Sequence, residues 1–128
     1  MKTTIKRKQP TLRLKTASAQ EVMDFGDAFS DDLEAPAPCD GTTELVLAGR
    51  QTVGLVSYLV RNYELIITQL YVAPEFRSFG LGQQILEILS QPEDVLITRV
   101  IATPSSAGYY EKLGFSPDMG HVILAKVK

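Results

Sequence analysis

The sequence has 128 residues, of which 45% are hydrophobic and 22% charged, and its formal net charge at pH 7 is −2. This length suits one domain of about 100 to 200 residues, and the apolar content is too high for an intrinsically disordered chain. We therefore expect a single domain over residues 1–128.

The charge is distributed unevenly. The first 15 residues contain six basic and no acidic residues, so the remainder carries seven basic against 15 acidic residues, a formal charge of −8. Such a body disfavours nucleic acid as a partner. No apolar run approaches the roughly 20 residues that span a bilayer, and none follows the basic N-terminus as in a secretory signal. With Cys39 as the sole cysteine, no intramolecular disulfide can form, so we expect a cytoplasmic protein without a membrane partner.

The N-terminal part is expected to form a strand and a helix. Alternating leucines predict a short strand at Thr11 to Lys15. Ser18 and Glu21 have the spacing of a capping box, which predicts that a helix starts there. Apolar residues then recur at helical spacing, at Val22, Phe25, Phe29 and Leu33. Prolines within Glu34 to Thr43 cannot continue a helix, so this stretch predicts a loop.

An acidic stretch overlaps this helix and loop. Between Gln20 and Glu44 there are eight acidic residues and no lysine or arginine. They are Glu21, Asp24, Asp27, Asp31, Asp32, Glu34, Asp40 and Glu44. Two interpretations stay open, a solvated helix face and loop or a surface that attracts a cationic substrate.

Three apolar runs in the middle of the chain predict three strands. They are Glu44 to Ala48, Thr52 to Val60 and Glu64 to Val72, with polar turns at Gly49-Arg50 and Arg61-Asn62. Connections as short as these join antiparallel neighbours in a sheet.

A helix and a further strand should follow. Residues 73–76 end the third strand, and the helix that follows them ends before Pro92. Its apolar face is formed by Leu81, Ile85, Ile88 and Leu89. The β-branched run Val95 to Ala102 predicts the strand, which should lie parallel to Glu64 to Val72 because a helix separates the two.

The C-terminal part is expected to hold one more helix and strand. Thr103 and Pro104 suit the N-cap and first position of a helix at Ser105 to Leu113, with Gly114 as its stop. The last strand is predicted at His121 to Val127, and its exposed edge could pair with a second subunit in a homodimer. The order β-α-β-β-β-α-β-α-β predicts an α+β domain with a mixed, strongly curved sheet flanked by helices.

A glycine-rich segment joins the third central strand to its helix. This segment, Arg77-Ser78-Phe79-Gly80-Leu81-Gly82, lies where two glycines let the backbone approach a ligand and turn its amides toward one point. The positive end of the helix dipole adds to this effect, so the segment suits a pyrophosphate. A tight turn without a ligand is the alternative.

A second motif makes the pattern specific. Arg77-x-x-Gly80-x-Gly82 behind Leu70 to Glu75 resembles the acetyl-CoA-binding motif of the GNAT superfamily of N-acetyltransferases, and Tyr110-Glu111-Lys112-Leu113-Gly114-Phe115 resembles its C-terminal motif. The resemblance covers Glu64 to Phe115. It implies the GNAT fold, acetyl-CoA as co-substrate, no metal, and direct transfer of acetyl to a primary amine.

The resemblance also implies roles for individual residues. Arg77 would supply the principal charge for the CoA phosphates, and the pyrophosphate would lie on the amides of Ser78, Phe79, Gly80, Leu81 and Gly82. The pantetheine arm would bind the backbone of Leu70, Tyr71 and Val72, where one amide would polarise the thioester carbonyl. Thr103 and Ser106 occupy the positions of the family's capping Asn and following Ala. Tyr110 matches the general acid that protonates the leaving thiolate, whereas Tyr109 is expected to pack.

The chain departs from the family pattern in two places. Relatives often have a basic residue at the positions of Ser78 and Phe79, so this chain lacks one cationic contact to the phosphates. We therefore expect it to bind the cofactor more weakly. Many relatives carry a carboxylate on the strand before the loop, but the matching Thr68 and Gln69 cannot accept a proton, and the nearest carboxylate on that strand is Glu64. We do not expect His121 or Cys39 to act in catalysis, and no residues have metal-ligand spacing.

Two functions are compatible with these features. The acidic stretch favours a cationic acceptor, either a small amine or the amine of a peptide. The alternative is a catalytically silent acyl-CoA-binding regulator that acts on a protein partner. The missing carboxylate, Phe79 and a single N-terminal helix, where most relatives have two, motivate this alternative.

Overall fold

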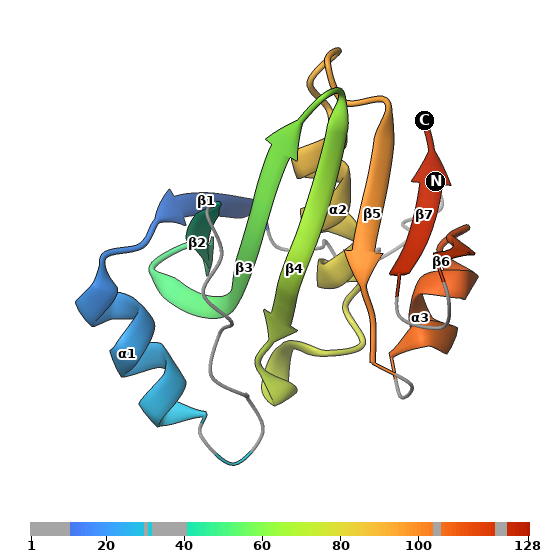
Figure 1. The fold of residues 1–128 in the computed structure, drawn as a ribbon. Helices are drawn as coiled ribbons and strands as arrows, with labels where there is room; N and C mark the ends of the chain where they lie inside the picture. Colours follow the sequence, from blue (N-terminus) through green and yellow to red (C-terminus); the bar gives the residue numbers. More distant parts are fainter. Residues whose placement is uncertain (1–10, 30, 32–40, 104–105, 120–122) are drawn as a thin grey trace, which may run out of the picture.

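The structure is built on one mixed seven-stranded sheet with the strand order β1-β2-β3-β4-β5-β7-β6 (Figure 1). The computed structural model describes residues 11–29, 31, 41–103, 106–119 and 123–128. The strands are β1 (Leu12–Thr16), β2 (Thr42–Ala48), β3 (Gln51–Arg61), β4 (Glu64–Val72), β5 (Ile97–Ile101), β6 (Ser116–Met119) and β7 (Ile123–Val127). The helices are α1 (Ala19–Ala28), the 3-10 helix η1 (Pro74–Phe76), α2 (Leu81–Ser90) and α3 (Ala107–Lys112). No helix in these ranges is long and apolar enough to cross a membrane.

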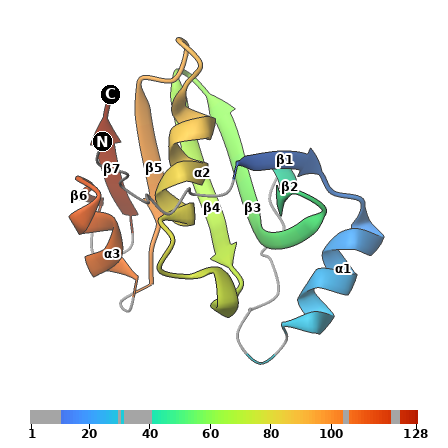
Figure 2. The ribbon, with the colours of Figure 1, turned by 180° about the vertical axis from the view of Figure 1, so that it is seen from behind.

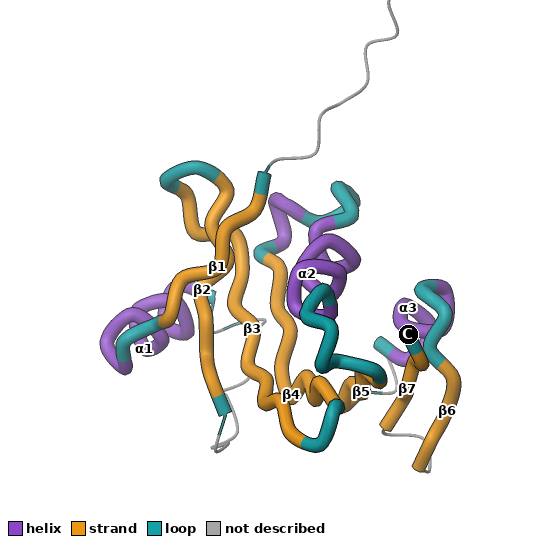
Figure 3. Tube along the Cα trace, turned by 90° about the horizontal axis from the view of Figure 1, so that it is seen from above, coloured by secondary structure: helices purple, strands orange, loops and turns teal. Residues whose placement is uncertain are grey.

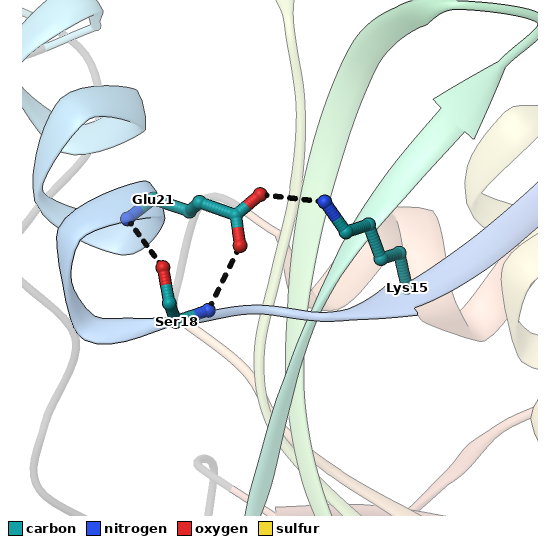
Figure 4. A network of polar contacts seen from close by, with 3 residues as sticks. All are labelled: Lys15, Ser18 and Glu21. Atoms are coloured by element: carbon teal, nitrogen blue, oxygen red, sulfur yellow. Dashed lines mark hydrogen bonds and ion pairs between the residues drawn. The ribbon is translucent and has the colours of Figure 1, made fainter.

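The capping box predicted at the start of α1 is confirmed (Figure 4). The Ser18 hydroxyl accepts a hydrogen bond from the Glu21 amide at 3.1 Å, and the Ser18 amide donates to the Glu21 carboxylate, also at 3.1 Å. The other Glu21 oxygen accepts from Lys15 Nζ at 2.9 Å. The bond from Lys15, followed by those from Ser18, lowers the pKa of the Glu21 carboxyl. Local side chains therefore fix where α1 begins.

Helix α1 is shorter than its apolar pattern predicts. It ends at Ala28, where the Phe29 amide turns back to the Gly26 carbonyl at 3.3 Å and tightens the last turn. Phe25 is buried, and Val22 and Phe29 pack around it. Residues 32–40, which include the predicted apolar position Leu33 and most of the predicted loop, lie outside the described residues.

The two longer helices lie on opposite sides of the sheet (Figure 3). Helix α2 covers one face of the sheet, as Figure 2 shows, and its buried residues lie on the side toward that face. These are Leu81, Gly82, Ile85, Leu86 and Leu89, which include three of the predicted face positions. Neighbouring strand residues support this division, because Val56 packs with α2 and Leu55 with α1. The site described below lies where α2 begins.

The hairpin between β3 and β4 has a strained turn. The pairing of Arg61 with Glu64 places the turn at Asn62-Tyr63, one residue later than predicted. Both turn residues have positive φ, 52° and 65°. Two-residue hairpin turns of this kind favour Asn-Gly, since glycine adopts the left-handed conformation without steric conflict.

Replacing Tyr63 by glycine is therefore expected to stabilise the fold. A side chain in the left-handed region costs about 1 to 2 kcal/mol, and the exposed Tyr63 ring recovers little of this by burial. Thermal unfolding followed by circular dichroism should show a midpoint higher by about 4 °C. Tyr63→Ala, which keeps the Cβ atom, is the control and should not stabilise; equal midpoints for both variants would contradict this explanation.

The C-terminal part differs from its prediction. Strand β6 was not expected, because Ser116-Pro117-Asp118 has weak strand signals and proline cannot donate to a ladder. It pairs with β7 on the side away from β5. The prediction of an exposed β7 edge for a homodimer is therefore wrong, since β7 has a neighbour on both sides and the sheet edges are β1 and β6.

Candidate active site

Strands β4 and β5 separate and leave a notch in the sheet. Their parallel pairing runs from Glu64–Ile97 to Ile67–Val100, which confirms the predicted parallel arrangement. Beyond Ile67, β4 continues to Val72 without a partner on that side, and Figure 1 shows the two strands diverging there. The notch therefore exposes one edge of β4 within an otherwise continuous sheet.

Backbone alternation decides which β4 groups face the notch. The Ala73 amide donates to the Val53 carbonyl of β3 at 2.8 Å. In an antiparallel pair alternate residues hydrogen-bond the neighbour, so Tyr71 also directs its backbone groups to β3. Leu70 and Val72 direct theirs into the notch. The expectation that all three residues offer backbone groups to a pantetheine arm is therefore wrong for Tyr71.

A cavity of about 660 Å³ opens at this notch. It is bounded by the end of β4, the glycine-rich loop, the first turn of α2 and helix α3. Its lining residues are Leu70, Tyr71, Val72, Phe76, Arg77, Ser78, Gly80, Leu81, Gly82, Ser106, Tyr109 and Tyr110. The fold thus brings together most of the predicted site residues, while Phe79 and Thr103 do not line the cavity. Phe76 and Tyr109 were missed, although each adjoins a predicted motif.

The glycine-rich loop has the geometry of an anion-binding site. Ser78 and Gly80 both have left-handed φ values, 74° and 72°. Gly80 is the N-cap of α2 without a side-chain cap, and the first bond of the helix is donated by Gln84 to the Gly80 carbonyl at 3.1 Å. The amides of Leu81 and Gly82 consequently have no partner within the helix. Left-handed residues in such a loop turn successive amides toward one point, where a phosphate can lie.

Arg77 lies at the strand edge. Its Nε atom donates to the Val72 carbonyl at 2.9 Å, and its guanidinium carbon lies 5.3 Å from the centroid of the Tyr71 ring. The Tyr71 ring is buried against Phe25 and Phe29, with centroid separations of 5.9 and 5.7 Å. Arg77, the predicted principal charge of the site, is thus held at the open end of the notch by the carbonyl of Val72, one of the two residues that face it.

Tyr110 is buried at the inner side of the cavity. Its side chain is 6% exposed, and its ring packs edge-on against Tyr109 and Phe115 at 5.3 and 5.7 Å. Burial, with a smaller contribution from the neighbouring Tyr109, raises the pKa of Tyr110 to about 12. The phenol therefore stays protonated at neutral pH and can donate a proton.

Helix α3 begins later than predicted. It starts at Ala107 with Ser106 as N-cap, and Gly114 (φ 97°) follows its end as expected. Thr103 and Ser106 form a turn before it: the Thr103 amide donates to the Ser106 hydroxyl at 2.9 Å, and the Ser106 amide donates to the Thr103 carbonyl at 3.0 Å. This turn takes up the hydrogen-bonding groups that the predicted N-cap would have used, and residues 104–105 lie outside the described residues.

Among the described residues that line the cavity, none is a carboxylate that could act beside Tyr110. Thr68 donates its hydroxyl to the Ser57 carbonyl at 3.1 Å. Glu64, at the far end of β4, forms an ion pair with Arg99, which also binds Asp118 at 2.9 Å. Within the described ranges no cluster of His, Cys, Asp or Glu could hold a metal ion. His121 and Cys39 lie outside these ranges.

Part of the acidic stretch is hydrogen-bonded within the fold, and one of its carboxylates is paired with a cation. Glu21 pairs with Lys15, Asp24 accepts from the Gln20 amide group at 2.8 Å, and Glu44 accepts from the Tyr58 hydroxyl. Burial, followed by Glu44, raises the pKa of Tyr58 to about 12. Asp32, Glu34 and Asp40 are outside the described residues, and none of the described acidic residues lines the cavity.

Comparison with known proteins gives a family match and a set of structural neighbours. The family model described as an acetyltransferase (GNAT) domain matches residues 13–124. No curated protein matches the sequence. Among solved structures, an acetyltransferase from Thermus thermophilus has a TM-score of 0.71 at 16% identity, covering 94% of this chain and 97% of that one.

Two further solved structures carry names that specify a ligand or an acceptor. Arabidopsis thaliana Naa50 in complex with the bisubstrate analogue CoA-Ac-MVNAL has a TM-score of 0.69 at 12% identity, covering 91% and 99% of the two chains. The ribosomal-protein-S18-alanine N-acetyltransferase from Escherichia coli has a TM-score of 0.63 at 15% identity, covering 91% and 94%. At these identities the likeness shows a shared fold.

Proposed function

Because the chain belongs to the acetyltransferase (GNAT) domain family, we propose that it transfers the acetyl group of acetyl-CoA to a primary amine. The observation that carries the proposal is the cavity at the notch. It combines an open strand edge, a loop that directs its amides to one point, and a buried, protonated tyrosine. The strand edge suits the pantetheine arm, the loop suits the pyrophosphate, and the tyrosine suits the sulfur of the proposed co-substrate.

The residues present fit acetyl-CoA. The amides of Leu81 and Gly82 and the left-handed loop before them would hold the pyrophosphate. The backbone of Leu70 and Val72 would bind the pantetheine arm as an added strand does, although the Val72 carbonyl must first exchange Arg77 for that arm. When bound, acetyl-CoA supplies the acetyl group as a thioester, which an amine attacks at the carbonyl carbon with release of the CoA thiol.

Tyr110 is proposed as the general acid. A phenol that keeps its proton up to high pH is available to hydrogen-bond the sulfur and to protonate it as the C–S bond breaks. Transfer to a thiolate whose conjugate acid has a pKa near 8.5, if cysteine is taken as the model, is unfavourable by itself and would be coupled to that bond cleavage. The proton that the amine loses would leave through water, and Tyr110 would regain its own from water. A notch-facing amide of Leu70 or Val72 would polarise the carbonyl.

A peptide or protein amine is the acceptor that we propose first. One solved neighbour contains a bisubstrate analogue with the sequence MVNAL, and another is named for an alanine of a ribosomal protein. The acidic residues of α1 that have no described cation beside them, Asp24 and Asp27, would favour a positively charged peptide.

The pH dependence of kcat/KM should follow the pKa of the acceptor amine, because no base of the protein is proposed to remove its proton. Since Tyr110 acts in its protonated form and titrates at about pH 12, kcat/KM should rise as the amine deprotonates and show no fall below about pH 10. The rise should centre near pH 8 for an α-amine and above about pH 10 for a lysine amine. Profiles for one peptide carrying either amine would test this. A common midpoint for both would mean that a protein group removes the proton.

The proposal itself is tested by thermal unfolding with and without acetyl-CoA, together with thiol release over cationic, neutral and anionic amines. A ligand that binds the folded state alone must raise the unfolding midpoint. A raised midpoint with thiol release is the expected result. A raised midpoint without thiol release would favour the alternative function, a catalytically silent acyl-CoA-binding regulator. The absence of a carboxylate among the described lining residues supports that alternative. An unchanged midpoint would refute both functions.

A further inference from the structure

Tyr109 connects two helices across the cavity. It lies on α3 next to Tyr110, yet its hydroxyl lies against the first turn of α2, where an atom added at Gly82 would come within 2.2 Å of it and where the Gln83 backbone is its polar neighbour. Gln83 follows Leu81 and Gly82, whose amides face the proposed phosphate site. The hydroxyl of Tyr109 thus contacts α2 from a neighbouring helix, beside a first-turn amide that follows those two and has no partner within α2.

Gly82 makes this contact possible. A Cβ atom at Gly82 would lie 2.2 Å from the Tyr109 hydroxyl oxygen and 3.2 Å from the ring carbon that bears it. The first distance forces the hydroxyl to move away, whereas the second alone would require a shift of a few tenths of an ångström. The second glycine of the loop is therefore needed for a contact within the protein as well as for the approach of a ligand.

The contact also bears on the position of Tyr110. Helix α3 has six residues, and its N-cap Ser106 makes no capping hydrogen bond through its side chain. A helix this short has little stability of its own and is placed by its tertiary contacts. The Tyr110 ring is packed between the rings of Tyr109 and Phe115. Holding Tyr109 in place therefore holds one side of the Tyr110 packing site.

We propose that Tyr109 is a positioning residue for acetyl transfer, whose hydroxyl fastens α3 to the first turn of α2 and so keeps Tyr110 directed into the notch. This inference rests on the proposed function. It assigns to Tyr109 an action through Tyr110, with no contact to the reacting atoms. Binding of the phosphates and orientation of the acid would then share one structural unit, the first turn of α2.

The first test is Tyr109→Phe, which removes the hydroxyl and keeps the ring. Because a misplacement of about 1 Å can reduce a rate about 100-fold, the loosened helix is expected to lower kcat about ten-fold and to leave KM for acetyl-CoA within roughly two-fold. Hydrogen exchange of the Gln83 amide in the free protein should become about five-fold faster. Tyr63→Phe, a hydroxyl deletion at the opposite end of β4, should change none of these quantities.

The second test is Gly82→Ala in both backgrounds. In the wild type the added Cβ displaces the hydroxyl, so kcat should fall about as far as in Tyr109→Phe. In the Tyr109→Phe background the same change should lower kcat at saturating acetyl-CoA by less than it does in the wild type, since the contact is already absent, while an effect of the added methyl group on cofactor binding would appear in KM for acetyl-CoA. Multiplicative effects of the two substitutions would overturn the inference.

Two further outcomes would also overturn it. An unchanged kcat in Tyr109→Phe with normal wild-type turnover would refute the role of Tyr109 alone. Tighter acetyl-CoA binding by Tyr109→Phe in calorimetry would mean that the hydroxyl competes with the cofactor for the Gln83 amide. A wild type that neither binds acetyl-CoA nor releases thiol would instead refute the proposed function, so the two failures can be told apart.

Discussion

Replacing Tyr110 by phenylalanine is expected to lower kcat for acetyl transfer about 100-fold, the lower end of what a general acid contributes. The ring would keep its packing against Tyr109 and Phe115, so the dissociation constant for acetyl-CoA should change by less than roughly two-fold. Thiol release under saturating substrates measures kcat, and titration calorimetry measures binding. A large loss of kcat with little change in the dissociation constant for acetyl-CoA would indicate a group that acts on the leaving thiolate.

The neighbouring tyrosines provide the controls. Tyr109→Phe should have a smaller effect on kcat, about ten-fold, because its hydroxyl acts only through the position of Tyr110. Tyr63→Phe should have none. If Tyr110→Phe retained most of the wild-type kcat, water would protonate the thiolate and Tyr110 would be a packing residue.

Replacing Gly80 by valine is expected to weaken acetyl-CoA binding about 100-fold, the worth of one or two charge-assisted hydrogen bonds. Gly80 has φ 72°, which a β-branched residue adopts only at a cost of about 1 to 2 kcal/mol or more. The loop would relax by turning the Leu81 and Gly82 amides away from their common point. Calorimetric titration with acetyl-CoA measures the loss directly.

Gly49→Val is the matched control for this variant. Gly49 also has a left-handed φ, 63°, but it lies in the exposed turn between β2 and β3, where an added Cβ would contact nothing. Both variants should lower the unfolding midpoint by a similar few degrees, about 4 °C for each kcal/mol. Only Gly80→Val should lose affinity; equal affinities would mean that the loop does not hold the pyrophosphate.

Elements with short-range signals could be predicted from the sequence. The capping box of Ser18 and Glu21 determines its helix start through bonds within one turn. Strand β4 has its predicted bounds, Glu64–Val72, because a turn and a proline flank a continuous apolar run. The glycine-rich loop was found for the same reason, since both its chemistry and its geometry lie in a few consecutive residues.

Features that depend on distant partners could not be predicted. Strand β6 exists because β7 offers it a ladder, and nothing in Ser116–Met119 itself indicates a strand. Which β4 residues face the notch depends on the pairing of Ala73 with Val53, a register that the β4 sequence does not contain. The contact of Tyr109 with Gln83 joins two helices, so the sequence suggested only a packing role.

The gap between β4 and β5 is also a gap in the hydrogen-bonding ladder of the sheet. Among the described residues no strand pairs with the backbone groups of Leu70 and Val72 that face it, and Arg77 donates to one of them, the Val72 carbonyl. A continuous sheet would gain stability at these positions, but it would leave no free groups for an extended ligand. The notch thus keeps unused hydrogen-bonding capacity in a rigid frame, so that binding at this edge need not be preceded by ordering of the chain.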